Sequence, residues 1–210
     1  MAHERSAVFL WMKALANLLI LCLMFPCAAT CWLERVLSPD ADIVFPLWTH
    51  ALALVPGFVG LYVRRAFYRL TLTSCRPNLT INFGSFFSKR EVHVEDDVYI
   101  GAFAVIGRAR LGAGCLIGTR VSLLSGSAQH QLDEHGHWTA SSAEHFREIQ
   151  IGQHSWIGEG AIVMADVGEG SVVSAGAVVA APVPAGVLVA GNPARFVRRM
   201  RPDGPDGSAA

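Results

Sequence analysis

The sequence has few charged residues and no excess of either sign. Only 16% of its residues are Asp, Glu, Lys or Arg, and 17 basic residues balance 17 acidic ones. A protein that binds nucleic acid neutralises phosphates with a surplus of Lys and Arg. The balance therefore argues against a nucleic-acid partner.

The sequence also lacks a cysteine pattern suited to a disulfide framework or a metal site. Its five cysteines are an odd number, and no two of them are separated by two residues. Small secreted domains and zinc modules carry paired cysteines at such spacings. A reducing cytosolic setting fits this chain best.

Charge is missing altogether from two long runs near the N-terminus, residues 14–33 and 43–63. As a helix, the first run would be about 30 Å long, the thickness of the hydrocarbon core of a bilayer. Arg64, Arg65 and Arg69 follow the second run. By the positive-inside rule both ends of such a hairpin face the cytoplasm. We expect residues 1–75 to form an apolar helical region that anchors the chain at the cytoplasmic face of the inner membrane.

Three other interpretations of this region stay open. A basic start, an apolar run and the small residues Ala28 and Ala29 also resemble a secretory signal peptide. Pro26, Pro46 and Pro56 interrupt the runs, so the helices can instead be shallow or re-entrant. Finally, the two runs can be helices that pack on their own domain.

From residue 92 onward, aliphatic residues recur at an interval of six almost throughout, with one step of five at Ile106–Leu111 and one of four at Val163–Val167. This period fits neither a helix nor a hairpin. Glycine directly follows seven of these twelve aliphatic residues, and a small residue or valine follows most of them four positions later. The aliphatic positions are Val94, Ile100, Ile106, Leu111, Ile117, Leu123, Ile151, Ile157, Val163, Val167, Val173 and Val179. The pattern predicts a parallel β-helix over residues 76–195, with three hexads in each coil and four to five coils in the repeat.

The repeat stops between Leu123 and Ile149. We expect a loop at residues 125–149 that leaves the solenoid, and such loops are where function usually lies. After the repeat, Gly191, Asn192 and Pro193 mark its exit, because proline prevents another ladder strand from continuing. Residues 196–210 are expected to form a basic segment and a disordered tail.

Residues 151–198, IGQHSWIGEGAIVMADVGEGSVVSAGAVVAAPVPAGVLVAGNPARFVR, resemble the C-terminal half of the hexapeptide-repeat acyltransferases. This family includes the galactoside, serine and xenobiotic acetyltransferases, and the left hand of the β-helix follows from the resemblance only. Residues 125–133, SGSAQHQLD, are similar to the loop that carries the family's catalytic histidine. The resemblance thus implies that His130 is the general base, with Asp133 or Glu134 available to orient its ring.

The resemblance also implies acetyl-CoA as co-substrate, no metal, and a homotrimer with active sites between subunits. The cofactor would meet Trp156 and the backbone around Gly158, Ala175 and Gly176, while Arg195 and Arg198 would bind its phosphates. For Trp156 the alternative is a corner residue that buries against another subunit, and for the arginines it is contact with anionic lipid.

The function expected is O-acetylation of a sugar hydroxyl on a surface polysaccharide or a lipid-linked glycan precursor, with the predicted anchor motivating that acceptor. A serine O-acetyltransferase is the enzyme alternative. Two other classes stay open. His130, His135, His137 and His145 could bind zinc as in the β-helical carbonic anhydrases, and the β-helix could be a non-catalytic scaffold at the membrane.

Overall fold

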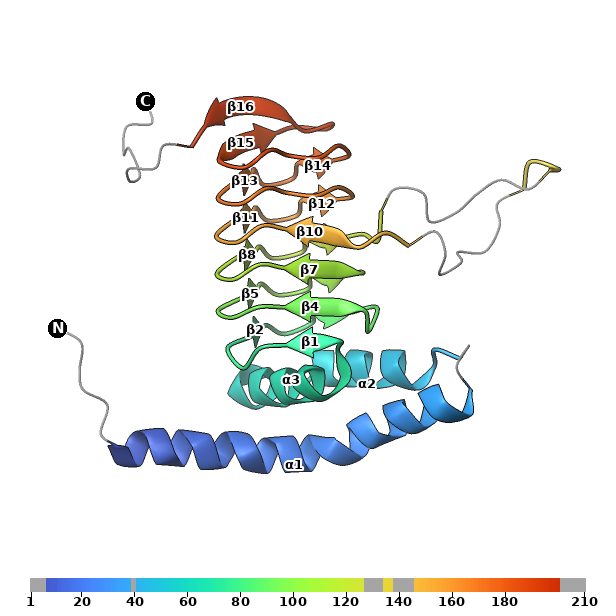
Figure 1. Ribbon diagram of the computed structural model, residues 1–210, viewed down its shortest axis with the longest axis vertical. Coiled ribbons are helices and arrows are strands. Elements are labelled where there is room, and N and C mark those ends of the chain that lie inside the picture. The colour runs from blue at the N-terminus through green and yellow to red at the C-terminus, as the bar shows by residue number, and fades with distance from the viewer. Residues whose placement is uncertain (1–6, 39–40, 127–133, 138–145, 201–210) are drawn as a thin grey trace.

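The protein is a β-solenoid whose first coil is covered by three helices (Figure 1). The computed structural model describes residues 7–38, 41–126, 134–137 and 146–200. Short parallel strands form three sheets that wind around one axis. Sheet A contains β1 (Ser74–Cys75), β4 (Val92–Val94), β7 (Ala109–Leu111) and β10 (Ile149–Ile151).

The other two sheets complete each coil. Sheet B contains β2 (Thr80–Ile81), β5 (Tyr99–Ile100), β8 (Leu116–Ile117), β11 (Trp156–Ile157), β13 (Val172–Val173), β15 (Val187–Ala190) and β16 (Arg195–Arg199). Sheet C contains β3 (Phe86–Phe87), β6 (Val105–Ile106), β9 (Ser122–Leu123), β12 (Ile162–Val163) and β14 (Val178–Val179).

The six-residue repeat predicted from the sequence is the repeat of the solenoid. All twelve aliphatic residues of the pattern are buried, and equivalent residues pair in register between coils, as Ile100, Ile117 and Ile157 do in sheet B. Each side chain therefore packs on its counterpart in the coils above and below. No single repeat could bury its apolar side alone, so the core exists only because the coils stack.

The solenoid extends further at both ends than the sequence pattern indicated. It has about six coils instead of four to five, because β1, β2 and β3 form a first coil before residue 92. Its first strand, Ser74–Cys75, falls inside the region assigned to the helices. At the other end β16 pairs antiparallel with β15, so the predicted basic segment forms a strand over residues 196–199. Proline 193 ends the parallel winding but does not prevent this reversal.

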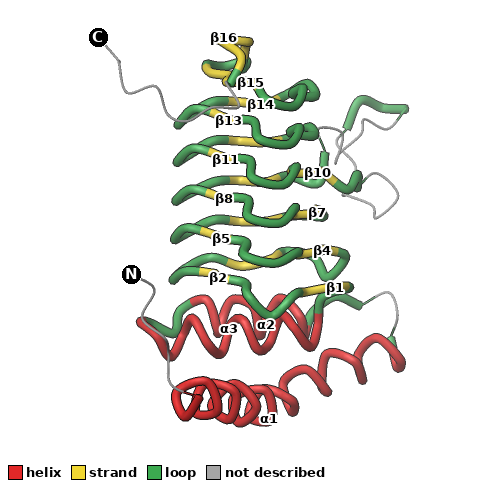
Figure 2. Tube along the Cα trace, turned by 60° about the vertical axis from the view of Figure 1, so that its left-hand side comes forward, coloured by secondary structure: helices red, strands yellow, loops and turns green. Residues whose placement is uncertain are grey.

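The helices α1 (Ala7–Leu37), α2 (Val44–Ala53) and α3 (Gly57–Thr71) lie at the N-terminal end of the solenoid (Figure 2). The second predicted span, 43–63, is not one helix. It is divided at Pro56, which precedes α3, and the ten residues of α2 extend only about 15 Å. That run therefore does not form a single helix long enough to cross a bilayer.

Arg64 of α3 joins the helices to the first coil. Its guanidinium group is buried and donates to the carbonyl oxygens of Leu52 (3.0 Å), Val55 (2.8 Å) and Ile81 (3.1 Å). The first two lie at the end of α2, where a helix leaves carbonyls without partners, and the third lies in β2. One side chain thus holds the end of α2, the start of α3 and the solenoid together.

Arg64→Leu is expected to lower the free energy of unfolding by about 3 kcal/mol, because several buried carbonyl groups lose their donor. Urea unfolding of the detergent-purified protein, followed by tryptophan fluorescence, measures the change. Arg69→Leu is the matched control, since Arg69 lies on the same helix and is exposed. Equal stability of the two variants would show that the Arg64 network does not hold the helices to the solenoid.

Candidate functional site

A ladder of outward-facing side chains runs along sheet B. Its residues Tyr99, Leu116, Trp156, Val172 and Leu188 pair in register from strand to strand, so they lie directly above one another. In each strand, the residue that follows the ladder residue points into the core. Tyr99, Leu116 and Trp156 are exposed, and Trp156 retains 53% of its accessible surface. Large apolar residues on an outer strand face indicate a surface that contacts a ligand or a partner.

This ladder forms one wall of an open groove with a volume of about 920 Å³. The groove continues over the corner between sheets B and C, where Gly118, Thr119, Glu159 and Ser174 line it. Arg198 and Met200 lie at its C-terminal end, because β16 folds back beside β15. The result is a long, mostly apolar channel with a guanidinium group at one end.

Four of the six residues that the sequence predicts to bind the cofactor line this groove, namely Trp156, Gly158, Ala175 and Arg198. Gly176 and Arg195 lie outside its lining. Gly176 instead takes a left-handed conformation, with φ of 68°, at the corner between sheets B and C, and Arg195 donates to the carbonyl oxygen of Ala194 (3.1 Å). The resemblance thus named residues of which four line one groove, and their role in binding a cofactor stays a prediction.

The backbone amides at this corner differ in their availability to a ligand. Gly158 N donates to Val173 O (2.7 Å) and Gly176 N to Glu159 O (2.8 Å), so both amides belong to the hydrogen bonds between coils. Within the described residues, Ala175 N has no acceptor. Gly158 is required for packing as well, since a Cβ atom there would lie 2.5 Å from Ala175 N. An added strand-like ligand would thus find its free donor at Ala175 and not at the two glycines.

The predicted catalytic residues are only partly within the described structure. His130 and Asp133 lie outside the described residues. Glu134 is exposed, and its Oε1 atom lies 3.5 Å from Nε2 of His135, whose ring centroid is 6.4 Å from that of His137. The loop interrupts the winding of the solenoid between β9 and β10. Ile149 was assigned to the loop, but it is the first residue of β10.

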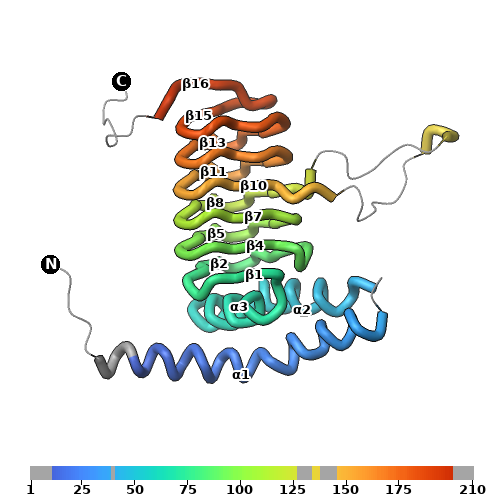
Figure 3. Tube along the Cα trace, viewed as in Figure 1, coloured from blue at the N-terminus to red at the C-terminus, as the bar shows by residue number. Residues whose placement is uncertain are grey.

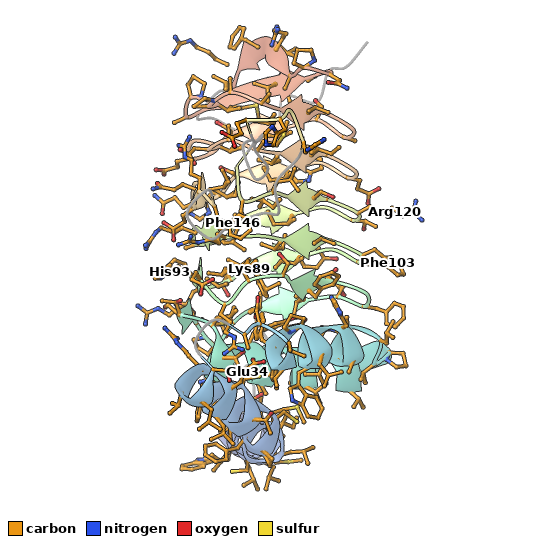
Figure 4. The ribbon with its side chains drawn as sticks, turned by 90° about the vertical axis from the view of Figure 1, so that its right-hand side faces the viewer. Glu34, Lys89, His93, Phe103, Arg120 and Phe146 are labelled. Atoms are coloured by element: carbon orange, nitrogen blue, oxygen red, sulfur yellow. The ribbon has the colours of Figure 1, made fainter. Side chains whose placement is uncertain are left out.

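The two ends of this loop are fixed to the corner between sheets C and A. Arg147 N donates to Ser125 O (2.9 Å), and Ser125 Oγ accepts from Arg108 N (2.8 Å). Arg147 also pairs with Asp166 of the next coil. Phe146 lies beside Lys89, whose ammonium group is 5.1 Å from the ring centroid (Figure 4). The residues that enter and leave the loop are therefore held by several coils.

Comparison with known proteins agrees with this fold. The family described as the hexapeptide repeat of succinyl-transferase matches residues 148–181. No curated protein shows a match to the sequence. A maltose O-acetyltransferase from Clostridium difficile 630 has a TM-score of 0.58 at 17% identity, over 74% of this chain and 84% of that one. The chain therefore shares the β-helix fold of that protein, and a hexapeptide-repeat family matches part of it.

Two further solved structures are similar at lower TM-scores. The acetyltransferase domain of PglB from Neisseria gonorrhoeae FA1090, in complex with acetyl coenzyme A, has a TM-score of 0.47 at 24% identity, over 60% of this chain and 52% of that one. A mutant of AntD, an N-acyltransferase from Bacillus cereus, has a TM-score of 0.49 at 16% identity, over 59% and 71% of the two chains. Its structure contains dTDP-4-amino-4,6-dideoxyglucose and coenzyme A.

The β-helix places Cys115 directly beneath the groove wall, but this thiol is not suited to carry an acyl group. Cys115 is fully buried, and burial raises the pKa of its thiol to about 12. The thiolate is the nucleophilic form, and it is scarcely populated at neutral pH with such a pKa. Cys115 is therefore not a candidate nucleophile for acyl transfer in this groove.

A second groove, which the sequence pattern did not indicate, lies on sheet A of the hexapeptide-repeat solenoid. It has a volume of about 580 Å³ and a polar lining that includes Glu95, Arg110, Gln150, Asp166 and Glu169. His93, Arg110 and Gln150 occupy equivalent outward positions on β4, β7 and β10. Their alternation with buried aliphatic residues was the one available signal, and it does not distinguish a site from a solvated strand face.

In the described part of the chain, no three His, Cys, Asp or Glu side chains come together in a group that could hold a metal ion. His93 and His154, the histidines of sheet A and of the corner after β10, lie far apart in sequence and on different coils. His130 and His145 lie outside the described residues, so the zinc alternative is decided by metal analysis of the purified protein.

Proposed function

We propose that this protein is an acyltransferase that moves an acetyl or short acyl group from coenzyme A to a sugar hydroxyl. The groove along sheet B carries the proposal. Its length, apolar wall and terminal guanidinium group suit a thin thioester cofactor with a phosphate-bearing end. The match of residues 148–181 to the succinyl-transferase repeat supports the same class of reaction.

In this proposal Trp156 packs against the pantetheine arm, and Ala175 N donates to one of its amide carbonyls. Arg198 pairs with a phosphate group, since a guanidinium group matches phosphate oxygens in two parallel hydrogen bonds. Each of these groups positions the thioester; none of them takes part in proton transfer. The ladder of sheet B thus sets where along the solenoid the acyl carbon lies.

His130 is the proposed general base. It accepts the proton of the acceptor hydroxyl while the hydroxyl oxygen forms a bond to the thioester carbonyl carbon. The tetrahedral intermediate then collapses with cleavage of the carbon–sulfur bond, and the proton passes from His130 to the departing thiolate. The products are an O-acyl sugar and free coenzyme A, so no further reactant is needed. Asp133 or Glu134 would orient the imidazole ring.

The acceptor proposed is a surface polysaccharide or a lipid-linked glycan precursor at the cytoplasmic face of the inner membrane. Its support is the long apolar N-terminal helix. Residues 11–37 of α1 are long and apolar enough to cross a membrane, with a mean hydropathy of 2.1, and only 17% of the most apolar window is buried within the protein. We further propose a homotrimer, which the mass of the detergent-solubilised protein tests directly.

Calorimetric titration with acetyl-CoA tests the donor without any assumption about the acceptor. The detergent-purified protein should bind about one acetyl-CoA per subunit, and Trp156→Ala and Arg198→Ala should each weaken binding about tenfold. Ile162→Ala is the matched control, because Ile162 is an exposed aliphatic residue of sheet C, away from the groove.

The two possible outcomes of the titration distinguish the acyltransferase from the alternative functions. Binding that the groove variants weaken would support the acyltransferase and justify a comparison of sugar acceptors with serine. No saturable binding by a folded, oligomeric protein would overturn the proposal. Stoichiometric zinc would then point to a hydratase, and its absence to a scaffold.

A further inference from the structure

Helix α1 lies across the end of the solenoid and not along its axis (Figure 3). It is attached near both of its ends. Toward the N-terminus, Asn17 Oδ1 accepts from Arg65 Nη2 of α3 (2.9 Å). Toward the C-terminus, Arg90 donates to the carbonyl oxygen of Cys31 (2.9 Å) and pairs with Glu34 (2.7 Å).

The attachment to Arg90 is an ion pair removed from solvent. The side chains of Glu34 and Arg90 retain 7% and 12% of their accessible surface, and Glu34 also accepts from the amides of Ile43 and Val44. Figure 4 shows Glu34 where α1 meets the rest of the protein. A charge pair of this kind is strongly destabilised when one partner is withdrawn, so it holds the end of α1 to the solenoid.

The two attachments fix the direction of the helix. Asn17 and Glu34 are about 26 Å apart along a helix, at 1.5 Å per residue. A rod held to the same base at two points this far apart cannot turn away from that base. If α1 crossed a bilayer, Arg65 and the Glu34–Arg90 pair would have to enter the hydrocarbon core with it, at a high cost in free energy.

The exposed surface of α1 consists mainly of large apolar side chains, and its exposed charges, Lys13 and Arg35, lie toward the two ends. One stripe of the helix, with Met24, Ala28 and Cys31, is buried, while the opposite side is open. Figure 4 shows the side chains of α1 projecting away from the solenoid on that side. The exposed large apolar residues of α1 are Trp11, Met12, Leu15, Leu18, Leu19, Leu23, Phe25, Trp32, Leu33, Val36 and Leu37. A soluble surface rarely carries a continuous apolar patch of this length.

We propose that α1 lies in the plane of a lipid bilayer, with its open side among the acyl chains and its other side bound to α3. The charges around the helix favour a bilayer over a second copy of the chain. Lys13 and Arg35, near the two ends of α1, and Arg69 of α3 are exposed, and they match anionic lipid headgroups. Trp11 and Trp32 are also exposed near the two ends, the place of aromatic anchors at a membrane interface.

This arrangement sets the orientation of the whole protein. The solenoid stands upright on the membrane, and Trp156 of β11 lies three coils above β2, about 14 Å at a strand spacing of about 4.8 Å. Only one layer of helices lies between α1 and the first coil, and it adds about 10 Å. Trp156 thus lies on the order of 25 Å from the bilayer, and the N-terminus stays on the same side as the solenoid.

The position of the N-terminus can be tested without any substitution, so the result does not depend on whether a variant folds. The full chain with different epitope tags at its two ends is expressed, and protease is added to right-side-out and to inverted membrane vesicles. An in-plane α1 predicts that both tags are digested in the same vesicle preparation. Digestion of the two tags in opposite preparations would show that α1 crosses the membrane and would overturn the proposal.

The apolar side itself is tested with vesicles of phosphatidylethanolamine and phosphatidylglycerol. Leu19→Glu combined with Leu23→Glu should reduce flotation with these vesicles at least about tenfold, since both side chains face away from the protein. Ile162→Glu, on the solenoid, should float as the unchanged protein does. Acetyl-CoA binding by each variant reports its folding. Unchanged flotation of the double variant would overturn the proposal. If the double variant also lost self-association, the apolar side would be an interface between copies of the chain.

Discussion

Replacing His130 by alanine is expected to lower the rate of acetyl transfer about 10³-fold, with little change in the affinity for acetyl-CoA. A positioned general base contributes about 10² to 10⁴ to such a rate. Among the residues that the structure describes, none that lines the proposed donor groove belongs to the loop in which His130 lies. The rate of coenzyme A release is measured with a thiol reagent, and the affinity by calorimetry.

His137→Ala is the control for this experiment, because His137 belongs to the same histidine-rich loop and is exposed. It should retain most of the activity. Substantial transfer by His130→Ala would rule out His130 as the base. Loss of acetyl-CoA binding in this variant would instead mean that His130 holds the donor, and a loss of bound zinc would support the hydratase alternative.

The middle of the fold could be predicted because its repeat is carried by residues that the core requires. Between Val94 and Val179 each coil places an aliphatic side chain inward at a fixed interval, and any departure would leave a cavity or bury a polar group. The first coil obeys the same interval at Cys75, Ile81 and Phe87. Residues 76–195 were assigned to the β-helix, but this coil was not counted among the repeats, because a cysteine and a phenylalanine replace aliphatic residues and no glycine follows them.

The helical end and the last strand depend on contacts that local sequence does not encode. The division of the second apolar run is stabilised by Arg64, which binds carbonyl groups of α2 and of β2. From the sequence, this arginine was one of three positive charges flanking a span. The pairing of β16 with β15 likewise follows from a reversal of the chain, and the prediction that proline ends the winding says nothing of an antiparallel strand.

Four of the six residues that the resemblance assigned to the cofactor line one groove, but the hydrogen bonds there could not be predicted from the sequence. Trp156 and Arg198 are 42 positions apart, and the resemblance to other acyltransferases brought them to one site. Which amides are free depends on how coils pair, and a resemblance does not show it. Gly158 N and Gly176 N are used within the solenoid, while Ala175 N is left. The polar groove on sheet A had no sequence signal beyond alternation.

An upright solenoid restricts the acceptor as well. A lipid-linked acceptor must extend from the bilayer to the groove, whose lower end is at Tyr99, one coil above β2, and whose Trp156 lies on the order of 25 Å from the bilayer. A soluble sugar nucleotide is not limited in this way. The choice among acceptors therefore depends on the angle at which α1 meets the membrane, and not only on the residues of the groove.

Gly152→Ala is expected to lower the free energy of unfolding by about 3 kcal/mol, although it adds a single methyl group. Coils approach most closely at this corner. A Cβ atom on Gly152 would lie 2.3 Å from the backbone nitrogen of Glu169 in the next coil, and Gly112 and Gly168 are in the same situation with their own neighbours. Backbone cannot move aside as a flexible side chain can, so the spacing of two coils must increase.

Gly170→Ala separates this effect from the ordinary preference for glycine. Gly170 has a φ of 61°, but a Cβ atom there would meet nothing within 4 Å. Its replacement should therefore cost only the strain of a left-handed residue, about 1 kcal/mol. Thermal unfolding followed by circular dichroism should show a decrease in Tm of about 9 °C for Gly152→Ala and about 3 °C for Gly170→Ala. If the order were reversed, backbone conformation and not the distance between coils would explain the glycines of the repeat.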